Sequence, residues 1–179
     1  MSTVDLDLLV QLGRQRWAVA LIAALALRKG GRFVELLNAL GTNRESLTRT
    51  LEGCIGAGWV MRNPGHGHPL RPEYILTEQG WRIASLCQSI EETRQQIGLA
   101  PASFTRWSLP IISQIGGGAN RFNAISQGII GANPRALTQS LKSLVGQRLV
   151  DRIVLAEYPP VPEYWLAPNG ERLASAFDA

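Results

Sequence analysis

The sequence predicts a mainly α-helical protein with small antiparallel β-ribbons (an α+β fold), built from two similar domains in tandem. Two observations carry this prediction. The chain repeats itself at an offset of 90 positions, and each copy contains a helical pattern followed by two strand patterns. A chain of 179 residues suits two small domains of about 85–90 residues each. We place these domains at 1–97 and 98–179, with a long helix over 77–97 that joins them.

The internal repeat is the strongest signal in the chain. Matched positions include Asn43 and Asn133, Leu47 and Leu137, Thr48 and Thr138, Leu51 and Leu141, Val60 and Val150, Arg62 and Arg152, and Glu73-Tyr74 and Glu163-Tyr164. Upstream, Arg16-Trp17 matches Arg106-Trp107, and Arg32-Phe33 matches Arg121-Phe122 after a slip of one residue. Chance does not produce so many matches in nearly constant register, so we interpret the chain as a tandem duplication.

Apolar residues at helical spacing, separated by turn-forming glycines, predict the elements of each copy. The first copy reads as helices at 3–15, 17–27 and 32–40, a capped helix after Gly41, and strands at 59–61 and 74–76. The second reads as helices at 104–115 and 121–127, a capped helix from 133, two strands, and a final helix at 168–178. For the capped helix of the first copy, Thr42 and Glu45 offer a capping box.

Residues 133–166 are the most informative stretch. Asn133 is a natural N-cap, and Pro134 suits the first helical position. Leucines fill one face of the helix that follows, and the alternation in LVDRIVL and PPVPEYWL predicts a two-stranded ribbon. The opposite, polar face of the helix carries Arg135, Thr138, Gln139 and Lys142. A helix with an apolar back and a basic face, followed by a ribbon, indicates a winged helix-turn-helix, whose second helix can enter a DNA major groove.

The two copies differ on this polar face. Glu45 and Glu52 in the first copy stand where the second copy has Arg135 and Lys142. Because carboxylates are repelled by phosphates, we predict that the second helix dominates contact with double-stranded DNA. Arginines that begin the short helices, Arg32 and Arg121, either contact phosphate or are solvated. The full set of predicted DNA-contacting residues is Arg135, Thr138, Gln139, Lys142, Arg152, Arg121, Arg44, Thr48, Arg49, Arg32, Arg62 and Arg71.

These motifs resemble the HxlR-type winged-helix transcriptional regulators. The resemblance rests on Arg121-Phe122, Leu149-Val150-Asp151-Arg152 and the PPVPEY run at 159–164 in the second copy. In the first copy it rests on Arg16-Trp17, Arg32-Phe33 and the PEYILT run at 72–77. The resemblance implies a bacterial-type, DNA-binding transcriptional regulator. Since such regulators usually carry one domain and dimerise through terminal helices, two copies in one chain suggest a covalent pseudo-dimer, with a further homodimer also open.

Some relatives in that family sense oxidants through a cysteine ahead of the first core helix. This chain has no cysteine between Met1 and Trp17 or between Gly98 and Trp107, so the mechanism is not supported. Cys54 and Cys87 fall at apolar helical positions, and we expect buried thiols in a reducing cytoplasm. The start of the chain lacks the basic region of a signal peptide, and the apolar run 17–27 is too short to span a bilayer.

Composition and motifs argue against an enzyme. The net charge of +4 is a mild basic bias, which is compatible with nucleic-acid binding but does not prove it. His66 and His68, in a Gly/Pro-rich loop, are the only histidines, so a metal site or a catalytic triad lacks partners. No Walker-type lysine follows the GGGAN turn at 116–120. We expect no catalytic residue, metal or cofactor, and no constellation of residues identifies a small-molecule effector.

One alternative function stays open at this point. Glu45 and Glu52 on a recognition face favour a winged-helix scaffold that binds protein and has no DNA role.

Overall fold

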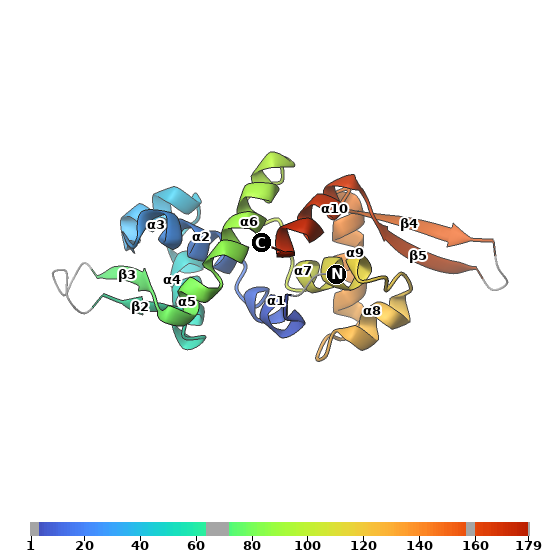
Figure 1. The fold of residues 1–179 in the computed structure, drawn as a ribbon, viewed down its shortest axis with the longest axis horizontal. Coiled ribbons are helices and arrows are strands. Elements are labelled where there is room, and N and C mark those ends of the chain that lie inside the picture. Colours follow the sequence, from blue (N-terminus) through green and yellow to red (C-terminus); the bar gives the residue numbers. More distant parts are fainter. Residues whose placement is uncertain (1–3, 64–71, 157–159, 179) are drawn as a thin grey trace. The chain divides into compact units, whose positions relative to one another are not determined.

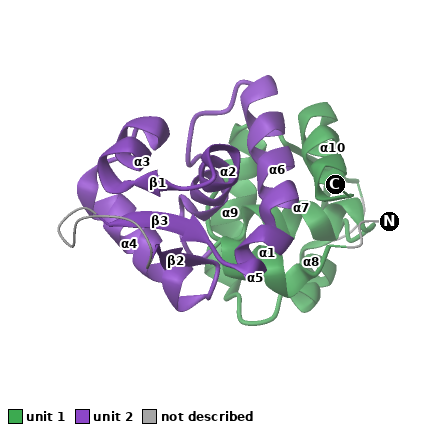
Figure 2. Cartoon of the chain, turned by 60° about the vertical axis from the view of Figure 1, so that its left-hand side comes forward, with its two compact units in different colours: residues 1–13, 104–179 green, residues 14–103 purple. Residues whose placement is uncertain are grey.

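The computed structural model describes residues 4–63, 72–156 and 160–178. They form two compact units, shown in different colours in Figure 2. The first-copy unit comprises residues 14–103, and the second-copy unit comprises residues 1–13 together with 104–179. Each unit is mainly helical with a small antiparallel ribbon, which confirms the predicted fold class (Figure 1).

The first-copy unit is a helical core with a three-stranded sheet. Its elements are α2 (Ala18–Arg28), β1 (Gly31–Arg32), α3 (Phe33–Leu40), α4 (Arg44–Gly56), β2 (Val60–Arg62), β3 (Glu73–Leu76), α5 (Glu78–Arg82) and α6 (Ala84–Gln96). The sheet is antiparallel in the order β1-β3-β2, and α2 packs against α3, α4 and α6. The α3–α4 pair followed by the β2–β3 hairpin makes the winged helix-turn-helix.

Two local predictions for this unit are wrong. The helix predicted over 77–97 is broken at Ile83, whose φ of −105° and ψ of 1° end α5 before α6 begins. The predicted Thr42/Glu45 capping box is not used. Instead Asn43 is the N-cap of α4, and its side-chain oxygen accepts a hydrogen bond from the Ser46 amide at 2.8 Å. Asparagine is among the best N-cap residues, so it displaces the threonine before it.

The second-copy unit repeats this order with a longer wing. Its elements are α7 (Ser108–Gly116), α8 (Phe122–Gly128), α9 (Pro134–Gly146), β4 (Val150–Leu155), β5 (Val161–Leu166), α10 (Pro168–Ser175) and a 3₁₀ turn (Ala176–Asp178). The hairpin pairs over six positions, from Val150 opposite Leu166 to Leu155 opposite Val161. The counterpart of β1 is reduced to a single bridge between Arg121 and Glu163.

The second-copy unit also contains the N-terminal helix α1 (Leu6–Leu12), which packs against α7. Leu9 and Leu12 are its buried residues. At its C-terminus Gly13 lies so close to the backbone of Arg106 that a Cβ would stand 2.0 Å from the Arg106 carbonyl oxygen. The grouping therefore differs from the division at 97/98, which assigned this helix to the first domain.

The segment after α6 belongs to the first-copy unit, whereas the sequence division placed 98–103 with the second. Two buried or half-buried contacts hold it. Arg94, paired through two nitrogens with the Glu91 carboxylate at 2.7 and 2.9 Å, donates to the Leu99 carbonyl oxygen. Arg16 donates from Nε to the Ala102 carbonyl oxygen at 2.8 Å. The Arg16 contact joins residues 86 positions apart in the sequence, so periodicity does not reveal it.

Gly80 and Gly170 occupy matching positions in the two copies and allow the backbone after each wing to approach the backbone before it. A Cβ at Gly80 would lie 2.1 Å from the Trp59 carbonyl oxygen, and one at Gly170 would lie 2.0 Å from that of Leu149. The same carbonyls accept hydrogen bonds from the amides of Thr77 and Ala167, both at 3.0 Å. Matching glycines at this offset therefore mark a close backbone approach that only glycine allows.

The two cysteines are free and buried in the core of the first-copy unit, as predicted. Burial raises the pKa of the Cys54 thiol to about 12, and burial together with the neighbouring Cys54 raises that of Cys87 further. Protonated thiols are poor nucleophiles, so these cysteines serve as small apolar core residues. None of the helices in the described part of the chain is long and apolar enough to cross a membrane.

Candidate nucleic-acid interface

Helix α9 separates an apolar back from a polar front. Asn133 caps it by accepting from the Ala136 amide at 2.8 Å, and Pro134 occupies the first turn. Leu137, Leu141 and Leu144 are buried against the unit. The four residues that the sequence placed on the opposite face, Arg135, Thr138, Gln139 and Lys142, are all exposed. The hydroxyl of Thr138 donates to the Pro134 carbonyl oxygen at 2.8 Å, which leaves its lone pairs to accept from a ligand.

A groove of about 390 Å³ runs between α9 and the wing of the second-copy unit. It is lined from the helix by Thr138, Leu141, Lys142 and Val145, and from the wing by Arg152 and Tyr164. The structure thus brings two predicted cations, Lys142 and Arg152, to the two walls of one groove. An arrangement of this kind suits a negatively charged backbone that enters beside the helix.

The equivalent face of α4 is also exposed but is electrostatically different. Its front carries Glu45, Thr48, Arg49 and Glu52. Nη2 of Arg49 lies 2.7 Å from Oε1 of Glu45, one turn earlier on the helix. Both side chains are well exposed, so the pair adds only about 0.3–0.5 kcal/mol and opens readily. The pair nevertheless places a carboxylate beside the main cation of this face. On α9 these positions are Arg135 and Gln139, which cannot form such a pair.

The arginines at the starts of the short helices have different surroundings. Arg121 is half-exposed, and its Nε lies 3.3 Å from Oε1 of the buried Glu163. Arg32 is exposed, and its backbone amide donates to Oε2 of Glu35 at 2.8 Å. The sequence left phosphate contact and solvation open for both. The structure adds a third role for Arg121, as the ion-pair partner that allows Glu163 to be buried.

The remaining predicted contacts lie around α4 and the first wing. Arg44 is exposed at the start of α4, with its guanidinium carbon 5.8 Å from the centre of the Phe33 ring. Arg62 is exposed on β2. Arg71, His66 and His68 lie outside the described residues. Within 4–63, 72–156 and 160–178, no three His, Cys, Asp or Glu side chains are placed to hold a metal ion.

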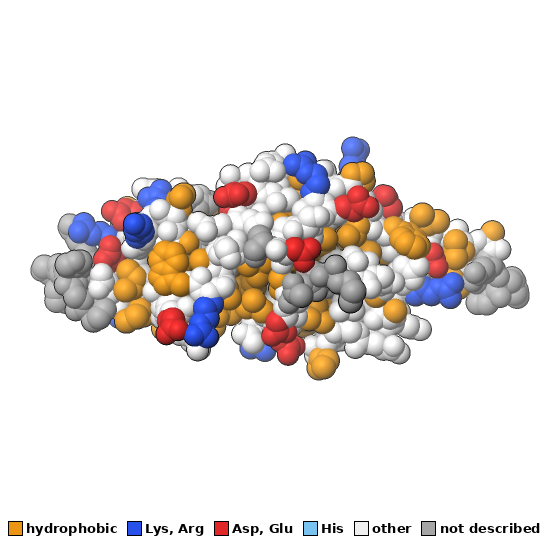
Figure 3. Space-filling model, in the orientation of Figure 1, with side chains coloured by type: hydrophobic (Ala, Val, Ile, Leu, Met, Phe, Trp, Pro, Cys, Tyr) orange, Lys and Arg blue, Asp and Glu red, His pale blue; other side chains and the backbone are white. Residues whose placement is uncertain are grey.

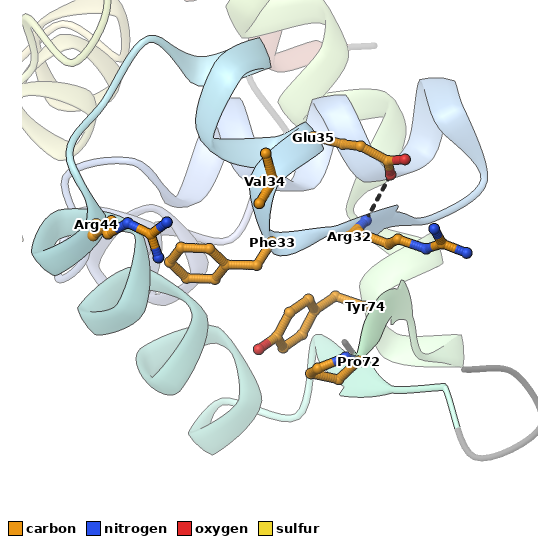
Figure 4. A pocket seen from close by; sticks show the side chains of 7 residues that line it. All are labelled: Arg32, Phe33, Val34, Glu35, Arg44, Pro72 and Tyr74. Atoms are coloured by element: carbon orange, nitrogen blue, oxygen red, sulfur yellow. Dashed lines mark hydrogen bonds between the residues drawn. The ribbon is translucent and has the colours of Figure 1, made fainter. Parts of the chain in front are cut away.

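A cavity of about 660 Å³ opens beside these residues in the first-copy unit, between the starts of α3 and α4 and the strand β3 (Figure 4). Its lining residues are Arg32, Phe33, Val34, Glu35, Arg44, Pro72 and Tyr74. Sequence reasoning did not find it. The repeated Arg-Phe and Glu-Tyr pairs were visible, but their convergence depends on strand pairing between β1 and β3.

Comparison with known proteins identifies the domain. The model of the HxlR-like helix-turn-helix family matches the chain twice, over residues 12–98 and 104–179. Over 70 residues the chain is 33% identical to YtfH of Escherichia coli K12, described as an uncharacterized HTH-type transcriptional regulator. That match covers 39% of this chain and 56% of YtfH.

An uncharacterized HTH-type transcriptional regulator of Methanothermobacter thermautotrophicus is 31% identical over 94 residues, covering 52% of this chain and 66% of that protein. The chain thus spans less than two thirds of the length of both curated relatives. Among solved structures, diamide-treated YodB from B. subtilis shows 29% identity and a TM-score of 0.38, over 49% of this chain and 80% of that one. Because the two family matches together cover most of the sequence, the protein belongs to the HxlR-like helix-turn-helix family and carries the family's domain twice.

Proposed function

We propose that the protein is a sequence-specific, DNA-binding transcriptional regulator of the cytoplasm, whose two winged helices act as a covalent pseudo-dimer. The observation that carries this proposal is the exposed face of α9, where Arg135 and Lys142 stand opposite a buried leucine face. Lys142 also lines one groove with Arg152 of the wing. Family membership supports the same function, since the relatives named above are described as HTH-type transcriptional regulators.

In this proposal α9 enters the major groove. Arginine and lysine can both pair with guanine, glutamine can pair with adenine, and the hydroxyl of threonine can accept from a donor on a base. Arg152, across the groove from Lys142, holds a phosphate of the adjoining backbone. Helix α4 contributes less, because Glu45 accompanies Arg49 and Glu52 replaces the lysine. The second winged helix is therefore the dominant reader.

Fluorescence-polarisation binding to a library of genomic fragments, repeated over a range of salt concentrations, tests this function. We expect a subset of duplexes to bind more tightly than about 10⁻⁶ M at moderate salt, the usual non-specific level, with affinity falling as salt rises. If every duplex binds only at that level, sequence-specific regulation through α9 is wrong.

A second candidate function is a protein-binding scaffold, and the second-copy wing favours it. Ile153, Val154 and Trp165 are 50%, 49% and 46% exposed on β4 and β5. Figure 3 shows hydrophobic side chains gathered over this wing. Exposed apolar groups of this kind often mark interaction surfaces. An affinity purification that recovers one stoichiometric protein and no enriched DNA, and that loses this protein in a Trp165→Ser variant, would favour the scaffold.

A further inference from the structure

The cavity of the first-copy unit has the dimensions and walls of a small-molecule site. Its volume of about 660 Å³ lies within the range of about 300–1,000 Å³ typical of such sites. Apolar walls come from Phe33 at the start of α3 and from Pro72 and Tyr74 at β3. Figure 4 shows the Tyr74 ring beside Phe33, with Pro72 next to it. A flat apolar group can therefore lie against two aromatic rings and a proline.

Tyr74 presents an unused polar group in this cavity. The residue as a whole is 7% exposed, and among the described residues its hydroxyl has no hydrogen-bond partner. In Figure 4 this hydroxyl is at the end of the Tyr74 ring that points away from Arg32 and Glu35. A ligand atom that accepts a hydrogen bond there would satisfy it.

Arg44 supplies an available cation on the same side. It lies over the Phe33 ring, and no carboxylate of the described residues is within ion-pair distance of it. The acid that lines the cavity, Glu35, already accepts from the Arg32 amide. Figure 4 shows Glu35 and the Arg32 side chain on the other side of Phe33 from Arg44. An anionic group beside Arg44 and Tyr74 is therefore separated from this carboxylate.

The second copy has lost this arrangement. Pro134 stands where the first copy has Arg44, and Asn123 and Ala124 replace Val34 and Glu35. Its Arg121 is engaged by Glu163, and its Tyr164 lines the groove beside α9. The copy with the acid-bearing recognition face thus has an arginine at this position of the cavity, whereas the copy with the basic face has a proline there.

We infer that the cavity at the starts of α3 and α4 binds a small molecule with a flat aromatic body and a carboxylate. The ring lies against Phe33, Pro72 and Tyr74, and the carboxylate accepts from the Arg44 guanidinium and the Tyr74 hydroxyl. Charge-assisted hydrogen bonds of this kind are the strong ones in protein sites. The inference goes beyond DNA binding and does not depend on it, because the site is tested without DNA.

Isothermal titration calorimetry of the full chain with naphthoate is the test. We expect one-to-one saturable binding. Acetate, which lacks the ring, and naphthalenemethanol, which lacks the charge, should each bind at least about tenfold more weakly. Arg44→Gln and Tyr74→Phe should each weaken naphthoate binding, Arg44→Gln by about tenfold or more. Tyr74→Phe keeps the ring, so it removes the hydroxyl alone.

The matched control is Arg49→Gln, which removes an exposed arginine from α4 outside the cavity and should leave naphthoate binding unchanged. Circular dichroism establishes that all variants are folded. No saturable binding at millimolar naphthoate overturns the inference, as does binding that Arg44→Gln and Tyr74→Phe leave unchanged. Equal binding of the neutral alcohol refutes the carboxylate assignment. None of these outcomes affects DNA binding by Arg135 and Lys142, which is measured separately.

Discussion

Single residues distinguish the two recognition helices. Arg135 and Lys142 are exposed on α9, whereas the matching positions of α4 are Glu45 and Glu52. Glu45 is also paired with Arg49 at 2.7 Å. Because phosphates repel carboxylates and attract free cations, the proposed function implies that the two surfaces differ in their affinity for DNA.

This difference predicts the effect of charge changes on DNA affinity. Arg135→Gln and Lys142→Gln should each cost roughly 1–3 kcal/mol if the residue reads a base, and less if it contacts a phosphate. Glu45→Gln and Glu52→Gln should leave affinity unchanged or raise it, since they remove repulsion. Fluorescence polarisation with the genomic DNA fragment that binds most tightly measures the affinity of all four variants. Arg82→Gln, on α5, controls for the loss of one exposed positive charge. A large loss on Glu45→Gln would instead show that Glu45 reads bases.

The buried thiols predict a pH dependence of stability in the first-copy unit. The pKa of Cys54 is raised from 9.0 to about 12 by burial, so the folded state holds a proton that the unfolded state releases. This contribution to the free energy of unfolding is therefore complete below pH 9 and is lost as pH rises towards 12. Urea unfolding at several alkaline pH values, compared with Cys54→Ala, measures it. An identical decline in both proteins would contradict the assignment.

At the scale of elements, each wing depends on a glycine at the start of the following helix. The Cβ position of Gly170 lies 2.0 Å from the Leu149 carbonyl oxygen, and that carbonyl also accepts from Ala167. The Leu149 carbonyl and the Ala167 amide both belong to the backbone, so neither can move aside as a flexible side chain could. The junction of the β4–β5 wing with α10 therefore tolerates no side chain at this position.

Gly170→Ala should lower the free energy of unfolding by roughly 1–3 kcal/mol, the usual cost of overpacking. Gly146→Ala is the matched control, because nothing lies within 4 Å of the Cβ position of this α9 residue. This control should leave stability unchanged or raise it by up to about 1 kcal/mol, since alanine restricts the unfolded chain. Thermal unfolding followed by circular dichroism compares the two. Equal stability of the two variants would mean that the wing junction relaxes freely.

At the scale of the whole molecule, the two compact units do not divide the chain at the boundary between the two sequence copies. Helix α1 precedes the first copy in sequence but packs on α7 of the second-copy unit, with Gly13 against Arg106. The segment 98–103 precedes the second copy but is held in the first-copy unit by Arg16 and Arg94. The first-copy unit therefore includes residues 98–103, which lead into the second copy. The second-copy unit includes residues 1–13, which lead into the first copy.

Deleting residues 1–13 should therefore destabilise the second-copy unit, although it removes sequence adjacent to the first copy. Loss of Leu9 and Leu12 uncovers α7, so hydrogen exchange of the α7 amides should accelerate. The α2 amides serve as the internal control and should keep their protection. Faster exchange confined to α2 would place α1 on the first-copy unit instead.

The asymmetry also predicts the shape of the bound DNA site. If α9 is the dominant reader, footprinting on the best fragment should show one strongly protected half-site beside a weak one. Identical subunits would instead protect a palindrome equally on both sides. Two equally protected half-sites on a single 19.6 kDa chain would show that α4 reads DNA as well as α9 does.

The sequence by itself determined the duplication, the fold class and the back-to-front polarity of α4 and α9. These features follow from patterns that are local along the chain: apolar periodicity, Asn and Pro at helix starts, alternation in strands, and matches at one offset. The buried cysteines and the exposed cations of α9 followed from the same periodicity. Family membership was visible because the motifs are short and contiguous.

Only the tertiary structure decided what depends on residues distant in sequence. Helix α1 joins the second-copy unit because its leucines are covered by α7, and no local pattern specifies that partner. The ion pair of Arg121 with Glu163 and the cavity that gathers Phe33, Arg44 and Tyr74 both require pairing between segments that are far apart in the sequence. A side chain's type and spacing predict which face it occupies, but packing decides which neighbour it meets there.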